Sequence, residues 1–122
     1  MMLRIFPILA VVAMLAANAA QANEAYPARP VRLVVPFAPG GVVDVMGRLL
    51  AQKLGEQLGQ NFIIENRGGG AGNTGAALAQ AAAPDGYTIL FTSSTFLVNP
   101  ALQKVPYDPV AGFAPITITS AS

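Results

Sequence analysis

A strand, a tight loop and the start of a helix follow one another in residues 31–44, Val31-Arg32-Leu33-Val34-Val35-Pro36-Phe37-Ala38-Pro39-Gly40-Gly41-Val42-Val43-Asp44. The first five of these residues are mostly β-branched and lie between two prolines, a pattern that predicts a short strand. Apolar residues then recur at every fourth position, which predicts a helix from about Val43 through Met46, Leu50, Leu54 and Leu58. Gly59 suits the position that ends such a helix.

The alternation of strand and helix continues along the chain. The sequence predicts a strand at residues 62–64, a helix at 74–83, a strand at 87–91, a short helix near 96–102 and the beginning of a fourth strand at 116–119. Strands and helices joined by short loops are typical of an α/β fold, in which helices flank a mostly parallel sheet. Ligands of such sheets bind beyond the carboxyl ends of the strands, and here each of those ends is a loop rich in Gly, Pro, Ser or Thr.

The composition excludes most catalytic chemistry. The chain of 122 residues contains no His and no Cys, so the usual zinc ligand sets, thiol nucleophiles, disulfides and a Ser-His-Asp triad are absent. Seven Lys and Arg against six Asp and Glu give a net charge of +1, which offers no electrostatic reason to bind nucleic acid. Carboxylates do not stand in pairs at a spacing suited to acid–base catalysis. We therefore expect a protein that is not an enzyme and uses no cofactor and no metal.

Residues 1–22 have the pattern of a secretory signal peptide. Arg4 is their only charged residue, residues 5–17 are almost entirely apolar, and Ala20-Gln21-Ala22 fits the small-x-small rule for cleavage. Ala17-Asn18-Ala19 fits the same rule, so cleavage after Ala19 is the alternative. The apolar run is shorter than the about 20 residues that a membrane-spanning helix needs. We expect export of a mature chain, residues 23–122, into the periplasm.

The loop after the first strand has features of an anion site. Gly40 and Gly41 let the backbone come close to a ligand, and the following helix directs its free N–H groups and positive dipole end at the loop. A carboxylate or a phosphate would suit this position without a charged side chain. Alternatively, the glycines make only a tight connection, and Asp44 is an acid that favours the first turn of the helix.

A second loop, at residues 65–75, contains the pattern G-x-G-x-x-G at Gly70, Gly72 and Gly75. In a dinucleotide-binding fold, an acid about 20 residues later holds the ribose at the end of the next strand. Here that strand ends in Thr92-Ser93-Ser94, and no Lys follows the glycines as in a Walker A loop. A nucleotide-dependent oxidoreductase stays open as an alternative. We expect Glu65 to anchor this loop, through backbone N–H groups or through Arg67.

The third loop, at residues 92–95, offers hydroxyl groups that can donate to an oxygen-rich ligand. Capping of the following helix by Ser94 or Thr95 is the alternative role for the same side chains. The two roles can coexist in neighbouring residues.

Five motifs in order resemble one known family. They are Val34-Val35-Pro36-Phe37-Ala38-Pro39-Gly40-Gly41 with Asp44, Glu65-Asn66-Arg67 ahead of the glycine loop, Pro84-Asp85-Gly86-Tyr87-Thr88, Asn99-Pro100-Ala101-Leu102 and Pro106-Tyr107-Asp108-Pro109. With them, the mature chain closely resembles the N-terminal part of the periplasmic solute-binding proteins of tripartite tricarboxylate transporters, the Bug or TctC-like family. The resemblance runs from Tyr26 to about Ile116.

The resemblance implies one lobe of a two-lobed, periplasmic-binding-protein-like α/β receptor. Such a receptor closes as a monomer on a small carboxylate, which could be a di- or tricarboxylate, an acidic amino acid or an aromatic acid, and delivers it to integral-membrane transporter subunits. The family holds the ligand carboxylate against the first loop, often through water, and the glycine loop lines the same cleft. With the hydroxyls of the third loop, the candidate ligand-binding residues are Phe37, Ala38, Gly40, Gly41, Asp44, Gly70, Ala71, Gly72, Thr74, Ser93 and Ser94.

The chain departs from the family pattern in several places. Val43 stands where a small hydroxyl residue is common, Gly68 replaces a Pro, Gly70-Ala71 reverses the usual pair, and Gly112 replaces an acid before Phe113. Family members are also much longer, so the resemblance implies that residues 23–122 form the first lobe and that the second lobe is absent. A natural truncation, a fragment of a longer protein and a truncated product without function all fit this length.

Overall fold

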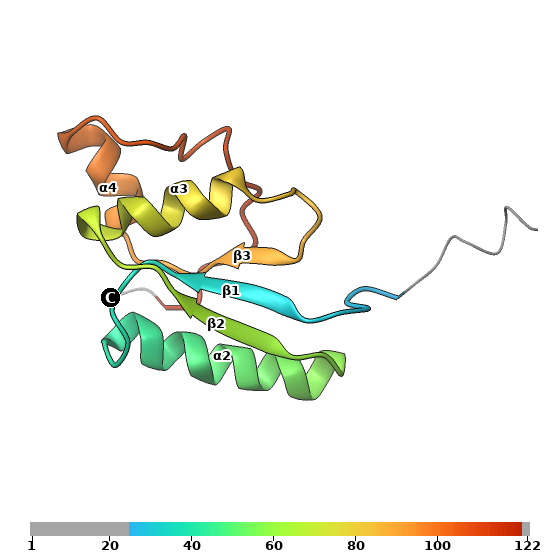
Figure 1. Ribbon diagram of the computed structural model, residues 1–122. Coiled ribbons are helices and arrows are strands. Elements are labelled where there is room, and N and C mark those ends of the chain that lie inside the picture. The colour runs from blue at the N-terminus through green and yellow to red at the C-terminus, as the bar shows by residue number, and fades with distance from the viewer. Residues whose placement is uncertain (1–24, 121–122) are drawn as a thin grey trace, which may run out of the picture.

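A computed structural model describes residues 25–120 of the chain (Figure 1). Its elements follow in the order β1 (Val31–Val35), α2 (Val42–Leu58), β2 (Phe62–Asn66), the 3₁₀ turn η1 (Gly70–Gly72), α3 (Asn73–Ala81), β3 (Thr88–Leu90) and α4 (Thr95–Leu102). The predicted signal peptide, residues 1–22, lies outside the described residues. Within residues 25–120, no helix is both long enough and apolar enough to cross a bilayer.

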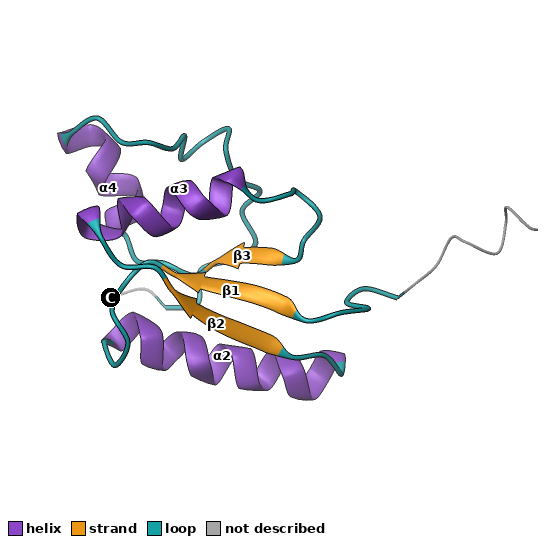
Figure 2. Cartoon of the chain, in the orientation of Figure 1, coloured by secondary structure: helices purple, strands orange, loops and turns teal. Residues whose placement is uncertain are grey.

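The three strands form one parallel sheet with β1 in the middle, in the order β2-β1-β3. Leu33 of β1 pairs with Ile64 of β2 on one side and with Ile89 of β3 on the other. Figure 2 shows α2 on one face of the sheet and α3 and α4 on the other. Because helices cover both faces, every residue of β1 except Arg32 is buried. The predicted α/β fold with a parallel sheet flanked by helices is therefore confirmed.

Helix α2 begins one residue before the predicted start and ends at Gly59, which has the expected left-handed backbone (φ 69°). Small residues, Gly47 and Ala51, form its buried face, whereas Met46 and Leu49 are 39% and 55% exposed. A Cβ atom on residue 47 would lie 3.2 Å from Cγ2 of Val35. The small residues let the helix approach the sheet closely, so part of the apolar pattern that predicted the helix lies on its outer side.

Three other elements differ from the prediction by a few residues at their ends. Strand β2 continues past residue 64 because Glu65 and Asn66 pair with Val34 and Val35 of β1. Helix α3 ends at Ala81, three residues before Pro84, and β3 is limited to Thr88–Leu90.

The fourth strand predicted at residues 116–119 is wrong. This segment has no regular structure, and Ile116 and Ile118 are 75% and 83% exposed. β-Branched residues favour an extended backbone, but a strand also needs a neighbouring strand with which to pair. Among the described residues, the sheet ends at β2 and at β3.

Helix α4 is held in place by three aromatic rings. The ring of Phe96, on α4, stacks on Tyr107 with the centroids 5.0 Å apart, and Phe113 packs edge-on against Phe96 at the same distance. The buried hydroxyl of Tyr107 donates to the carbonyl of Phe96 at 2.9 Å. The irregular segment after α4 therefore folds back and fixes the helix beside α3.

Candidate functional site

Three loops follow the carboxyl ends of the three parallel strands, as the sequence predicts. They are loop 1 (residues 36–41) after β1, loop 2 (67–72) after β2 and loop 3 (91–94) after β3. Figure 1 shows loops 1 and 2 at the same edge of the sheet, where α2 and α3 begin. This edge is therefore the candidate site.

Loops 1 and 2 are in direct contact. Nδ2 of Asn66, the last residue of β2, donates to the carbonyl of Phe37 at 3.1 Å. Gly72 lies against the ring of Phe37, since a Cβ on residue 72 would lie 3.4 Å from Cζ. Gly68 lies against the backbone of Ala38 in the same way, since a Cβ on residue 68 would lie 3.5 Å from the nitrogen of Ala38. The structure thus brings the predicted residues of these two loops together.

Asp44 is the buried acid at the start of α2. It is 2% exposed, and its Oδ2 accepts hydrogen bonds from the N–H of Gly40 at 2.8 Å and from Nε of Arg48 at 3.0 Å. Its Oδ1 accepts from Nδ2 of Asn66 at 2.8 Å. The hydrogen bond from Arg48, followed by those from Gly40 and Asn66, lowers the pKa of Asp44 to about 2. The carboxylate is therefore ionised at neutral pH, and it holds loop 1 through the N–H group of Gly40.

Asn66 is a site residue that the sequence analysis did not single out. One amide nitrogen joins the end of β2 to loop 1 and to α2, through Phe37 and Asp44. Its position directly before the glycine loop, at the carboxyl end of a strand, was the available signal.

Loop 2 turns through a run of left-handed backbone conformations. Gly69, Gly70, Ala71 and Gly72 have φ angles of 127°, 56°, 56° and 94°. The last three residues form η1, in which Gly72 donates to the carbonyl of Gly69 at 3.1 Å. The first N–H groups of such a turn have no partner inside it. Successive N–H groups in turns of this kind can form a concave anion site.

The G-x-G-x-x-G pattern has a packing explanation. A Cβ on Gly75 would lie 2.6 Å from Cβ of Pro36 and 2.8 Å from the carbonyl oxygen of Arg67. Only glycine lets α3 begin this close to the end of β1, so this residue is accounted for without a pyrophosphate. Thr74, next to it, is exposed at the start of α3.

Loop 3 is less closely connected to the other two loops. The hydroxyls of Ser93 and Thr95 lie 2.9 Å apart, and neither Ser93 nor Ser94 bonds to loop 1 or loop 2 in the described structure. Ser94 occupies the position before α4, but its side chain makes no capping hydrogen bond, so capping by Ser94 is wrong. Its carbonyl accepts from the backbone of Leu97 and Val98 instead.

The carboxylates near the loops are paired with arginines. The predicted contact of Glu65 with Arg67 is confirmed at 2.6 Å, and a second one, with Nε of Arg32 at 2.7 Å, was not foreseen. Arg32 first, then Arg67, lowers the pKa of Glu65. Asp44 is paired with Arg48 in the same way. The negative charges of Glu65 and Asp44 are therefore both compensated by arginines, which reduces their repulsion of an anion at the loops. Residues 25–120 hold no cluster of acids that could bind a metal ion.

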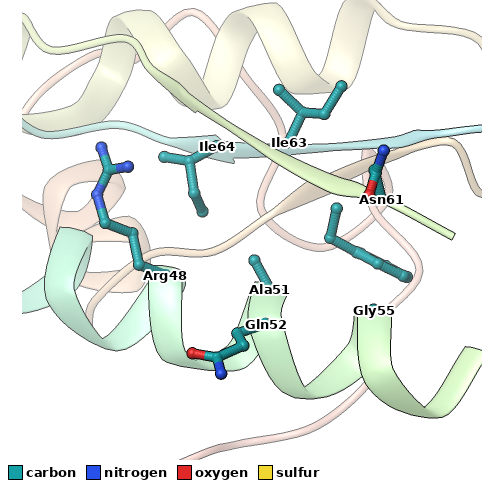
Figure 3. A pocket seen from close by; sticks show the side chains of 8 residues that line it. Arg48, Ala51, Gln52, Gly55, Asn61, Ile63 and Ile64 are labelled. Carbon is teal, nitrogen blue, oxygen red and sulfur yellow. The ribbon is translucent and has the colours of Figure 1, made fainter. Parts of the chain in front are cut away.

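A groove of about 580 Å³ lies between α2 and β2, away from the loops. Arg48 and Asn61 mark its two ends in Figure 3, and Ala51 and Gly55 form its floor on the helix. None of the predicted ligand-binding residues lines it. It borders the edge strand and not the carboxyl ends of the strands, so it is not the candidate site.

Comparisons with known proteins agree on one family. The family described as "Tripartite tricarboxylate transporter family receptor" matches residues 46–122. The fold is similar to that of the periplasmic binding protein BugD, with a TM-score of 0.72 and 44% identity over 75% of this chain and 31% of that one. Rpa4515 of R. palustris with adipate has a TM-score of 0.67 and 39% identity, over 70% of this chain and 29% of that one. MatC of Rhodopseudomonas palustris with bound malate has a TM-score of 0.64 and 35% identity, over 74% of this chain and 31% of that one.

The chain is short beside its relatives. It spans 26–28% of the length of curated proteins that it matches at 37–43% identity. The matched region is about a quarter of each relative.

Proposed function

The chain belongs to the tripartite tricarboxylate transporter receptor family, and from this premise we propose that it binds a small carboxylate in the periplasm for delivery to integral-membrane transporter subunits. Residues 1–22 would direct export, and residues 23–122 would form the first lobe of a two-lobed, monomeric receptor. The length supports the second point, because the chain spans about a quarter of its relatives. Adipate and malate in two similar structures support the ligand class.

The observation that carries the proposal is the junction at the start of α2, where Asn66, directly before loop 2, holds loop 1, and where Gly68 and Gly72 of loop 2 lie against loop 1. The amide of Asn66 bonds to Phe37 in loop 1 and to Asp44 in α2. The first turn of α2 leaves its N–H groups without intrahelical partners, and the helix dipole places partial positive charge there. Loop 2 adds the free N–H groups at the start of η1. A carboxylate placed between the loops would meet donors from both.

We assign different tasks to the candidate residues. The cleft would be lined by the backbone of Phe37, Ala38, Gly40, Gly41, Gly70, Ala71 and Gly72 and by the hydroxyls of Thr74, Ser93 and Ser94. The N–H groups of Gly40 and Gly72 already donate to Asp44 and to Gly69, so the donors to the ligand or its bridging waters would come from the other residues. Asp44 would act as a positioning residue, because it is buried and its oxygens accept three hydrogen bonds from the protein.

Calorimetry tests the ligand class. We expect residues 23–122 to bind adipate or malate saturably and to give no heat with glucose, which carries no carboxylate. Saturable binding of glucose with no binding of either dicarboxylate would contradict the proposal.

A chimera extends the test to a two-lobed receptor. The chain matches 29% of the adipate-bound receptor Rpa4515. Grafting residues 25–120 in place of the matching segment should preserve adipate binding, because the loops come from this chain and the second lobe from the receptor. A folded chimera that has lost adipate binding would count against the assigned role of the loops.

A further inference from the structure

We propose that Asn99, on α4, is the positioning residue that holds loop 2 in its ligand-binding conformation; the ligand role of the loop rests on the proposed function. Asn99 is 7% exposed and is, with Asp44, one of two buried polar residues in the part of the chain that the structure describes. Its Nδ2 donates to the carbonyl of Ala71 at 3.0 Å and to Oδ1 of Asn73 at 2.9 Å. Both N–H groups of the amide are thus directed at the turn that ends loop 2.

The residue that Asn99 contacts is the one whose backbone needs a restraint. Ala71 has φ 56° and ψ 36°, and it is the one non-glycine residue with positive φ among the described residues. A side chain makes this left-handed conformation unfavourable, because Cβ comes too close to the following carbonyl oxygen. The direction of a carbonyl group fixes ψ of its residue. By holding the carbonyl of Ala71, Asn99 also supports the next N–H group, that of Gly72, which donates to the carbonyl of Gly69 and closes the turn.

Helix α4 is a firm support for this contact. Phe96 lies three residues before Asn99 and is covered by the stacked ring of Tyr107 and the edge of Phe113. The hydrogen bond from Tyr107 to the carbonyl of Phe96 ties the same turn to the chain that follows. The turn of α4 that carries the amide is therefore held by the segment that follows the helix.

The two buried polar residues have matching tasks. Asp44 accepts the N–H of Gly40 and so holds loop 1, whereas Asn99 donates to the carbonyl of Ala71 and so holds loop 2. A ligand that takes hydrogen bonds from both loops needs their donors at a fixed separation. Loss of the Asn99 contact should therefore weaken ligand binding without disturbing the sheet.

Hydrogen exchange and binding of Asn99→Ser test the inference. The hydroxyl is too short to reach Ala71, and no charge is buried. Amide exchange in residues 72–74, whose N–H groups are bonded within the turn, should rise about fivefold, the equivalent of one ordinary hydrogen bond, while exchange at Leu33 and Val34 in β1 stays unchanged. Affinity for adipate or malate should fall by a similar factor. Asn61→Ser, an exposed asparagine before β2, is the matched control and should change neither quantity.

A second substitution separates positioning from general stability. Glycine adopts the left-handed conformation readily, so Ala71→Gly should recover most of the affinity that Asn99→Ser loses. A purely structural role of Asn99 would not be relieved by a change at Ala71. Unchanged exchange in residues 72–74, or equal acceleration in β1, would overturn the inference.

If Asn99→Ser does not fold, the side-chain amide protons of the wild-type chain test the inference instead. Those of Asn99 should exchange far more slowly than those of Asn61, and equal rates would overturn the inference. If the wild-type chain and the chimera bind neither adipate nor malate, the proposed function fails. The exchange measurements then decide alone whether Asn99 sets the conformation of loop 2.

Discussion

Asn66, the last residue of β2, donates a 2.8 Å hydrogen bond to the carboxylate of Asp44, the third residue of α2. The same nitrogen donates to the carbonyl of Phe37 at 3.1 Å. One amide therefore joins the end of β2 to a loop and a helix start that lie more than twenty residues earlier in the chain. The geometry of loop 1 depends on this junction as much as on its own glycines.

Asn66→Ala should destabilise the chain and weaken ligand binding. The substitution removes the hydrogen bonds to Phe37 and Asp44, each with an ordinary net contribution of about 1 kcal/mol, together with the longer one that Asn66 accepts from Arg48 at 3.4 Å, and it leaves the carbonyl of Phe37 without this donor. We expect a lower urea midpoint at unchanged m value. Asn61→Ala, at an exposed asparagine one strand length away, serves as control. Equal midpoints for Asn66→Ala and the wild type would contradict the role given to this junction.

Stability should fall in acid because the pKa of Asp44 is lowered. Arg48, then Gly40 and Asn66, bring this pKa from an ordinary value of 3.8 to about 2 in the folded state. The unfolded chain therefore binds the proton more readily, and the stabilisation present above the ordinary pKa is lost as the pH falls through the folded value. Glu65, whose pKa is lowered by Arg32 and Arg67, acts in the same direction.

Urea midpoints measured between about pH 6 and pH 2 check this prediction, with the decline expected below about pH 4. In Asp44→Asn the decline should be smaller, since one of the groups responsible has been removed. An Asp44→Asn variant with the same pH dependence as the wild type would show that Asp44 is not one of them.

Local patterns predicted the strands, the helices and the three loops. The β-branched run of β1 and the glycine that ends α2 depend only on neighbours in sequence, so they can be read without a structure. Asn66 had a local signal, its place between a strand and the glycine loop, but its partners Phe37 and Asp44 could not be read from the sequence. Asn99 begins one of the five motifs, but its partner Ala71 lies 28 positions away and nothing in the local sequence indicates that contact.

The wrong strand at residues 116–119 and the packed face of α2, which the sequence analysis did not specify, have the same origin. The segment at 116–119 has strand composition, but the existence of a strand depends on a partner elsewhere in the chain. The packed face of α2 depends on how close the helix must come to Val35, which favours Gly47 over the larger apolar residues. The presence of a partner strand and the distance between helix and sheet are both set by the tertiary structure, so local periodicity does not indicate them.

Gly75→Ala should destabilise the chain, although the same change usually stabilises a helix. The added methyl would lie 2.6 Å from Pro36 and 2.8 Å from the carbonyl oxygen of Arg67, so α3 or loop 2 must move. Overpacking of this kind costs about 1–3 kcal/mol. Gly55→Ala in α2 is the control, because its methyl would be 3.3 Å from its nearest neighbour, the carbonyl of Gln60. Chemical denaturation that shows equal effects for the two variants would refute the close contact of α3 with β1.

Gly41→Val separates ligand approach from folding in loop 1. Residue 41 has an ordinary φ of −75°, and the nearest atom to an added Cβ is the carbonyl oxygen of Ala38 at 3.6 Å. The fold therefore accepts a side chain here, and the urea midpoint should change little. A valine at the start of α2 would nonetheless cover the N–H groups that we assign to the carboxylate, so affinity for adipate or malate should fall about tenfold or more, which corresponds to about 1.4 kcal/mol. Calorimetry on a variant with wild-type stability makes the comparison direct: full affinity would mean that the ligand does not approach the backbone at Gly41.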